Sequence, residues 1–111
     1  MEMKRGAVVL AVVPGEYGKP RPAVVVQSNL FIPHHPSIII CPITSELQDT
    51  PISRLPVHST KKNGLHLPSE IMIDKVIALH RKRIGPVIGA LDEDTMLQLS
   101  RLLATFLGIA G

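Results

Sequence analysis

The sequence predicts a small, mainly-β barrel with one C-terminal helix, and three observations carry this prediction. Short runs of β-branched residues are separated by loops rich in Gly and Pro. Apolar residues follow helical spacing only near the C-terminus, between Asp92 and Gly108. The chain has 111 residues, of which 45% are hydrophobic. We therefore expect a single domain over residues 1–111, built around one core.

Three strands are predicted in the first half of the chain. Ala7 to Val13 is continuously apolar. The second strand is the run 23–26, entered through Arg21, whose flanking prolines favour an extended backbone. Its continuous Val-rich character is typical of a strand that is buried on both faces. The third strand is Ser37 to Ile43, and turn-forming loops cover residues 14–20 and 29–36.

The second half of the chain contains weaker strand signals. Ser53 to His58 alternates apolar and polar residues, which predicts a half-exposed strand. Lys61 to Gly64 is the strongest turn signal in the sequence. Residues 65–70 are predicted to be irregular, and Ile71 to Leu79 to form one strand. A basic loop over 80–83 and a last short strand over 85–90 complete the β part.

The C-terminal helix has recognisable ends and a wide apolar stripe. Asp92 is the expected N-cap, Glu93 and Asp94 complement the helix dipole, and Gly108 is the expected stop. Leu97 and Ile109 make the stripe wider than a lone surface helix needs. We therefore expect part of this helix to meet a partner subunit. The stripe itself comprises Met96, Leu99, Leu102, Leu103, Phe106 and Leu107.

Composition restricts the classes of function. The net charge of +3 and the pI near 9.4 are mildly basic and fit a polyanionic partner. Aromatic residues make up 3%, so RNA binding would depend on charge more than on stacking. Cys41 is the single cysteine and is predicted to be a buried structural thiol. Without a signal peptide or a membrane-length apolar run, we expect a soluble cytoplasmic protein.

No self-sufficient enzyme motif is present: there is no phosphate-binding glycine loop, G-x-S-x-G or H-E-x-x-H. His34 and His35 lack ligand partners at metal spacing, so we interpret them as a loop pair and expect neither a metal nor a cofactor. Four polar residues are more informative, because each lies at a strand end or interrupts an apolar run. For the two charged ones, Arg21 and Asp74, the simplest interpretation is an exposed charge. This set comprises Arg21, Thr44, Ser45 and Asp74.

The same residues carry a family resemblance over essentially the whole chain. Lys4-Arg5-Gly6 precedes a hydrophobic strand, and residues 19–28 match K-x-R-P-A-V-V closely. Residues 38–45 match V-x-V-[AC]-P-[IL]-T-[ST], and Asn63 to Val76 resembles a G-L…P-S…[DN] segment. In this order the pieces resemble the MazF/PemK (Kid) toxins of bacterial toxin–antitoxin systems, which are sequence-selective endoribonucleases. The closing segment, 83–85 and 91–94, resembles theirs as well.

The resemblance implies an SH3-like small β-barrel of the CcdB/MazF type that forms a homodimer. It also implies metal-independent cleavage of single-stranded RNA, with no cofactor. In that reaction the 2′-hydroxyl attacks the adjacent phosphorus and leaves a 2′,3′-cyclic phosphate and a 5′-hydroxyl. The implied partners are single-stranded mRNA and a cognate acidic antitoxin whose disordered tail orders on binding; no membrane is implied.

Carried over to this sequence, the family's catalytic roles fall on three residues. Arg21 is the expected stabiliser of the phosphoryl oxygens and a candidate general acid. Thr44 is expected to orient the scissile phosphate, and Asp74 to act as a base or a substrate contact. The residues expected to bind substrate are Ser45, Lys19, Tyr17 and Lys75.

The sequence also departs from the family pattern, and this keeps alternatives open. Residues 7–9 replace the usual aromatic and acid, Met72 stands where some members carry an arginine, and 75–78 lacks the usual Arg-Thr. One alternative is a catalytically degenerate module that binds RNA or an antitoxin without cutting. A gyrase-poisoning relative of the CcdB kind ranks last, because such proteins act through a C-terminal tryptophan and this chain has no Trp.

Overall fold

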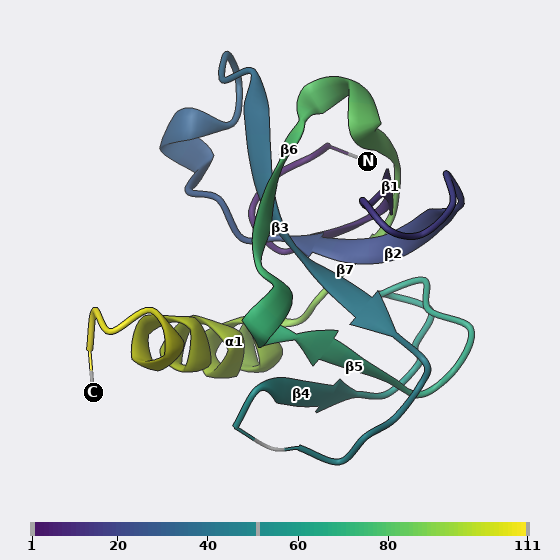
Figure 1. Cartoon of the computed structure of the whole chain (residues 1–111), viewed down its shortest axis with the longest axis vertical. Helices are drawn as coiled ribbons and strands as arrows, with labels where there is room; N and C mark the ends of the chain where they lie inside the picture. Colours follow the sequence, from purple (N-terminus) through teal and green to yellow (C-terminus); the bar gives the residue numbers. More distant parts are fainter. Residues whose placement is uncertain (1, 51, 111) are drawn as a thin grey trace.

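The computed structural model describes residues 2–50 and 52–110, and within them the chain is mainly β with one α-helix, as predicted (Figure 1). The strands are β1 (Ala7–Val12), β2 (Pro20–Val25), β3 (Ser37–Thr44), β4 (Arg54–Val57), β5 (Ser69–Met72), β6 (Ile77–His80) and β7 (Ile84–Ala90). Three short 3₁₀ turns are η1 (Asn29–Phe31), η2 (Ile73–Lys75) and η3 (Arg81–Arg83), and the helix is α1 (Glu93–Phe106).

The strands form one strongly bent antiparallel sheet in the order β4-β5-β3-β2-β1-β7. Strand β3 is its centre, because it pairs with β2 along one edge and with both β5 and β6 along the other. Helix α1 lies beside the β4–β5 end (Figure 1). This arrangement confirms the predicted barrel with a terminal helix.

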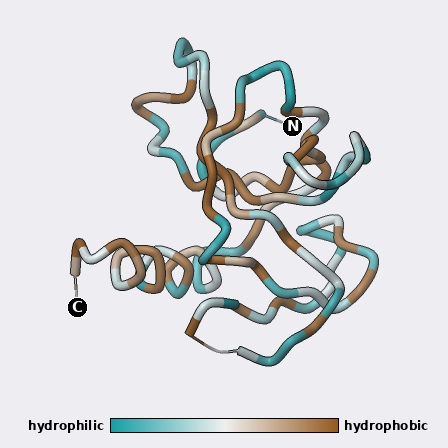
Figure 2. Tube along the Cα trace, in the orientation of Figure 1, coloured by the Kyte–Doolittle hydropathy of each residue, from teal (hydrophilic) through white to brown (hydrophobic). Residues whose placement is uncertain are grey.

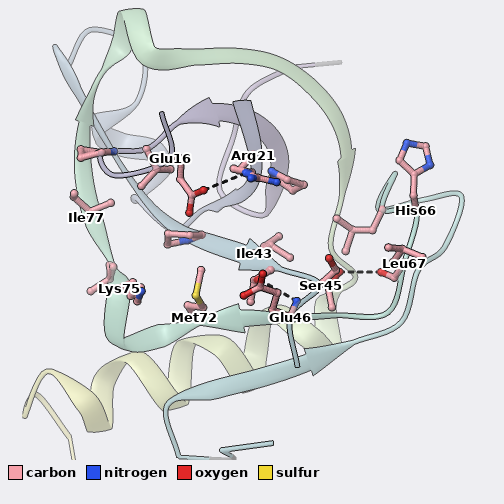
Figure 3. A pocket seen from close by; sticks show the side chains of 18 residues that line it. Glu16, Arg21, Ile43, Ser45, Glu46, His66, Leu67, Met72, Lys75 and Ile77 are labelled. Atoms are coloured by element: carbon pink, nitrogen blue, oxygen red, sulfur yellow. Dashed lines mark hydrogen bonds and ion pairs between the residues drawn. The ribbon is translucent and has the colours of Figure 1, made fainter. Parts of the chain in front are cut away.

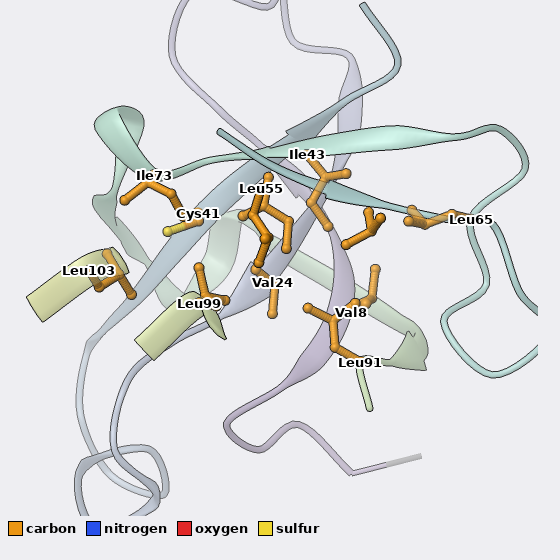
Figure 4. Close-up of a cluster of buried hydrophobic side chains, with 12 residues drawn as sticks. Val8, Val24, Cys41, Ile43, Leu55, Leu65, Ile73, Leu91, Leu99 and Leu103 are labelled. Carbon is orange, nitrogen blue, oxygen red and sulfur yellow. The ribbon is translucent and has the colours of Figure 1, made fainter. Parts of the chain in front are cut away.

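The central strands are buried on both faces. Along β1, Val8 faces the core beside α1 whereas Val9 faces a second core on the other side. On β2, Val24 joins the first core, and Ala23 and Val25 join the second. The prediction of a strand buried on both faces is therefore confirmed for residues 23–25, whereas β2 begins earlier than predicted, with Pro20 and Arg21 exposed. Figure 2 shows the hydrophobic segments crossing at the centre of the molecule. Figure 4 shows the core beside α1, which includes Cys41 as the expected buried thiol.

The prediction of one strand from Ile71 to Leu79 is wrong, because the turn η2 interrupts it. Ile43 of β3 pairs with Ile71, and Ile40 pairs with Ile77. Three steps along β3 thus correspond to six on the opposite segment, and η2 takes up the excess length. Ile73 remains buried in this turn, so hydrophobicity alone could not reveal the break.

Four smaller predictions also need correction. Strand β4 is not half-exposed, since only Pro56 of its four residues is exposed. Strand β5 begins at Ser69, inside the segment that was predicted to be irregular. The basic segment after β6 is the 3₁₀ turn η3, in which His80 Nδ1 accepts a hydrogen bond from the Lys82 N–H. Strand β7 begins at Ile84 and is therefore slightly longer than predicted.

Helix α1 begins and ends as predicted. Asp92 Oδ1 accepts a hydrogen bond from the Thr95 N–H at 2.7 Å, and the chain turns at Gly108 with φ +75°. Leu99 and Leu103 are buried against the sheet. The apolar stripe continues beyond this contact as an exposed group formed by Leu97, Phe106, Leu107 and Ile109. Neither α1 nor any other described helix is long and apolar enough to cross a membrane.

The predicted turn at Asn63-Gly64 is confirmed and organises the connection between β4 and β5. Asn63 is buried; its Oδ1 accepts from the N–H groups of Thr60 and Leu65, and its Nδ2 donates to the His58 carbonyl. Gly64 has φ +72° and lies directly against β7. A Cβ atom at Gly64 would be 2.2 Å from the Ile88 carbonyl oxygen. Both the backbone angle and the close approach therefore require glycine.

Gly64→Ala is expected to destabilise the fold strongly. The substitution combines a left-handed conformation, which costs about 1–2 kcal/mol for a residue with a Cβ, with a clash against backbone that costs about 1–3 kcal/mol more. Urea unfolding measures the change. Gly108→Ala is the matched control, because its φ is +75° and nothing lies within 4 Å of the added Cβ. Equal losses of stability in the two variants would contradict the close-packing argument.

Candidate functional site

A cavity of about 550 Å³ opens beside the end of β3 and brings together segments from across the chain. Its walls come from the loop after β1, the start of β2, the end of β3, the segment before β5, and η2 (Figure 3). Its titratable side chains are Glu16, Arg21, Glu46, His66 and Lys75. Apolar surface is supplied by residues such as Leu67, Met72 and Ile77. Mixed apolar and convergent polar walls are typical of ligand sites.

The pairing of β2 with β3 explains why Arg21 and Thr44 share this cavity. The last pair of this ladder is Ala23 with Pro42, and Arg21 and Thr44 each lie two residues beyond it on the two adjacent strands. Both residues line the cavity, although 23 positions separate them in the sequence. Because Arg21 lies within β2 and pairs with Ala11 of β1, its backbone is held on a rigid strand.

The Arg21 guanidinium is paired with a carboxylate. Its Nε lies 3.3 Å from Glu16 Oε2, and the side chains of Arg21 and Glu16 are 51% and 42% exposed. Glu16 comes from the predicted loop between β1 and β2, which is closed by a hydrogen bond from the Lys19 N–H to the Glu16 carbonyl. An ion pair this exposed is weak in water. The oxygens of an anionic phosphate group can therefore compete with Glu16 for the guanidinium.

The hydroxyl of Thr44 is oriented by the chain that follows it. Thr44 Oγ1 accepts a hydrogen bond from the Glu46 N–H at 3.0 Å. A hydroxyl that accepts in this way keeps its own O–H to donate. Thr44 is half-buried and Ser45 is exposed at the cavity wall. The end of β3 thus presents two hydroxyl groups next to Arg21, which suits recognition of a phosphoryl group.

A buried ion pair fixes the chain just beyond these hydroxyls. Arg54 Nη1 lies 3.1 Å from Glu70 Oε1, with side chains that are 10% and 5% exposed. Arg54 also donates to the Glu46 carbonyl, and Glu70 accepts from the N–H groups of Gln48 and Asp49. The bond from Gln48 contributes most to lowering the pKa of Glu70 below its usual value; the bonds from Arg54 and Asp49 act in the same direction, whereas burial opposes them.

The structure brings together four of the seven predicted site residues. Arg21, Thr44, Ser45 and Lys75 line the cavity. Tyr17 instead lines a shallower neighbouring hollow, and its side chain is 99% exposed. Lys19 and Asp74 are exposed and are not among the residues that line either hollow.

Sequence reasoning missed three titratable residues of the cavity. Glu16 lay in a segment that was interpreted only as a turn, Glu46 in a polar connection, and His66 among scattered histidines. The contact between Glu16 and Arg21 could not be predicted from their spacing, because the loop that joins them is irregular and follows neither helical nor strand periodicity. Arg54 and Glu70 were missed too. Arg54 lies in the segment 53–58, whose alternating pattern predicts an exposed face for its charged residues, and Glu70 lies in the segment 65–70, which is predicted to be irregular.

Two other kinds of chemistry find little support in the described part of the chain. No group of three His, Cys, Asp or Glu side chains in residues 2–50 and 52–110 is placed to hold a metal ion. Burial, with a smaller contribution from Asp74, raises the pKa of the Cys41 thiol to about 12. A thiol of this kind is a poor nucleophile at neutral pH.

Comparison with known proteins identifies relatives over the full length. A family model described as "PemK-like, MazF-like toxin of type II toxin-antitoxin system" matches residues 4–107. The chain is 37% identical to a "Probable endoribonuclease MazF" of Mycolicibacterium smegmatis, covering 98% of this chain and 100% of the relative. It is 30% identical to "Endoribonuclease EndoA" of Bacillus subtilis, covering 96% of this chain and 100% of that protein.

A solved structure agrees at the level of the fold. It is described as "Endoribonuclease in complex with its cognate antitoxin from Mycobacterial species" and superposes with a TM-score of 0.80 at 20% identity. The match covers 99% of both chains.

Glu70→Gln is expected to destabilise the protein by about 3–5 kcal/mol at neutral pH, because it leaves Arg54 buried without its anionic partner. Glu70 has a lowered pKa in the folded state. Its stabilisation is therefore present above the unfolded-state pKa and is lost as the pH falls through the lower folded-state value. Urea unfolding at pH 7 and at about pH 3 should show the difference from wild type shrinking in acid. Asp49→Asn, which removes a neighbouring exposed charge, is the control; a pH-independent difference would argue against an ionised Glu70.

Proposed function

The chain belongs to the PemK-like, MazF-like toxins of type II toxin–antitoxin systems, and we propose that it cleaves single-stranded RNA by attack of a ribose 2′-hydroxyl on the adjacent phosphorus. The enzyme is an endoribonuclease, like its relatives. The observation that carries the proposed chemistry is the cavity that Arg21 and Thr44 line together, one from β2 and the other from the neighbouring strand β3. A guanidinium and hydroxyls on rigid strands suit an in-line phosphoryl transfer.

Arg21 stabilises the negative charge that develops on the phosphoryl oxygens. Its planar, permanently charged fork can donate two parallel hydrogen bonds to phosphate, which a lysine cannot. Glu16 contacts the guanidinium at Nε. When the phosphate binds, Glu16 is left close to the reacting ribose and accepts the proton of the 2′-hydroxyl. The P–O5′ bond then breaks, leaving a 2′,3′-cyclic phosphate and a 5′-hydroxyl.

Thr44 and Ser45 orient the scissile phosphate. Thr44 is held by the Glu46 N–H and keeps a free donor for a phosphoryl oxygen. Arg54 and Glu70 hold the following residues in place, so they act as positioning residues for these hydroxyls. Because a small displacement of a reacting group lowers the rate steeply, this buried pair contributes to catalysis through geometry.

The remaining predicted residues contact the RNA on either side of the cut. Lys75 lines the cavity and supplies a second cation for a flanking phosphate. Tyr17 is fully exposed beside the neighbouring hollow and can stack on a base. Lys19 precedes Arg21 by two positions and adds an exposed positive charge to the same segment. Asp74 lies outside the cavity, which favours a substrate contact over the role of base.

The partners follow from the family and the surface. The exposed apolar group at the end of α1 fits a homodimer contact, as the width of its stripe predicted. A cognate antitoxin with an acidic segment suits the basic chain, whose net charge is +3. We expect the protein to act in the cytoplasm on single-stranded mRNA.

The first prediction is that the purified protein cuts a long single-stranded RNA in excess chelator and leaves 5′-hydroxyl ends. A substrate with a 2′-deoxy nucleotide at the mapped cut position should resist cleavage, because it lacks the nucleophile. End-labelling with polynucleotide kinase, which needs a free 5′-hydroxyl, identifies the product. RNA that stays intact but binds with a steep salt dependence would instead establish the non-catalytic binding module.

The second prediction concerns Arg21. Arg21→Ala should lower the rate of cleavage about 10²–10³-fold, the usual cost of removing one donor to a developing oxyanion. Arg21→Lys should retain part of the activity, since it keeps the charge without the fork. Arg101→Ala, on the exposed side of α1, is the matched control for loss of one arginine. Single-turnover cleavage measures the effect, and full activity of Arg21→Ala would remove this residue from the mechanism.

A further inference from the structure

We propose that His66 is the general acid that protonates the 5′-oxygen as it leaves. The inference deepens the proposed ribonuclease function and rests on it. His66 lines the same cavity as Arg21 and Thr44 and comes from a different wall, the segment before β5 (Figure 3). It is the only histidine among the described residues that line the cavity. An exposed histidine in a loop is usually no more than a solvated side chain. The role of His66 is therefore inferred from the segment that anchors it and from the other charged side chains of the cavity.

The segment that carries His66 is held firmly on both sides. On one side Leu65 is buried in the core beside α1, and its N–H donates to Asn63 Oδ1. Gly64 is packed against the Ile88 carbonyl of β7. On the other side the Leu67 carbonyl accepts a hydrogen bond from Ser69 Oγ at 2.8 Å. His66 is therefore presented by an anchored turn, which is what a group that must meet a reacting atom requires.

The other charged groups of the cavity are less suited to donating this proton. Arg21 carries a guanidinium, which does not give up its proton in proteins. Glu16 and Glu46 are carboxylates, and ionised carboxylates only accept. Lys75 supplies a compact cation, which suits a charge contact with phosphate. Imidazole is the side chain that both gives and takes a proton between about pH 5 and pH 8. These four charged groups line the cavity together with His66, which lies at its edge (Figure 3).

The apolar wall of the cavity offers no group that could protonate the leaving oxygen. Met72 stands on the wall between β5 and η2 and contributes a thioether with no proton to give. Ile77 and Val76 continue that wall as hydrocarbon. Arg21 and Lys75 are the Arg and Lys side chains among the described residues that line this cavity, and the proposal assigns the proton transfer to neither. The cavity thus contains an acceptor for the nucleophile's proton and one imidazole to supply the leaving group's proton.

The step is balanced without any further reactant. The 2′-oxygen forms a bond to phosphorus while its proton passes to the Glu16 carboxylate. The P–O5′ bond breaks, and the His66 imidazolium gives its N–H proton to the departing 5′-oxygen. The products are the cyclic phosphate, the 5′-hydroxyl, protonated Glu16 and neutral His66. Exchange of these protons with water restores the enzyme.

The test compares two leaving groups. Two RNA substrates are made at the mapped cut site, one natural and one with sulfur in place of the bridging 5′-oxygen, because a thiolate leaves without protonation. His66→Gln should slow single-turnover cleavage of the natural substrate about 10²–10⁴-fold, the usual contribution of a general acid. On the sulfur substrate the same variant should match wild type. His58→Gln is the matched control, since His58 begins the same connection and does not line the cavity.

The pH dependence gives a second readout. In wild type, cleavage of the natural substrate should fall at the alkaline end as the imidazolium loses its proton, and this fall should be absent in His66→Gln. Equal slowing on both substrates would make His66 a structural or binding residue and overturn the proposal. Unchanged cleavage of the natural substrate would overturn it as well. If wild-type protein cuts neither substrate, the ribonuclease function itself fails, whereas cutting that depends on Arg21 but not on His66 refutes only this inference.

Discussion

The hydrogen-bonded pairing of β3 on both of its edges is the constraint on which the rest of the structure depends. Strand β2 occupies one edge, and β5 and β6 share the other. Side chains of β3 enter both hydrophobic cores, with Cys41 and Ile43 on one side and Ile38 and Ile40 on the other. A strand held in this way cannot slip by one residue without exchanging its two faces. Its end is therefore a fixed point, and Thr44 is located there.

The cavity combines permanent charges with groups that can move protons. The turn η2, which takes up the excess length between β5 and β6, runs along the cavity wall and places Lys75 there. The opposite wall depends on Asn63 and Gly64, which determine the path of the segment before β5. The cavity is lined by the cations Arg21 and Lys75 and by the carboxylates Glu16 and Glu46, so its formal charges nearly cancel. Under the proposed function, phosphate binding replaces the weak, exposed contact between Arg21 and Glu16 with stronger, charge-assisted bonds.

The position of Met72 shows how one substitution changes the division of labour in such a site. Some members of the family carry an arginine there, whereas this chain has a thioether on the cavity wall. Under the proposed mechanism, one cation fewer means a weaker attraction for phosphate, and Arg21 supplies more of the electrostatic stabilisation. His66 and Ser45, which line the same cavity from other segments, are then the polar groups to which the proposal gives a larger share.

The sequence by itself determined the strands β1, β2 and β3 and the ends of α1. It also contained the two family motifs, residues 19–28 and 38–45, that include Arg21 and Thr44. Those features depend on local chemistry: β-branched runs, an N-cap at Asp92, a turn at Asn63-Gly64 and a distinctive family pattern. Tertiary structure alone decided that residues 71–79 break at η2, because the excess length appears only when the segment is paired with β3. It also decided that Glu16 meets Arg21, that Arg54 is buried against Glu70, and that His66 lines the cavity. These are contacts between distant segments, and no periodicity within either segment encodes them.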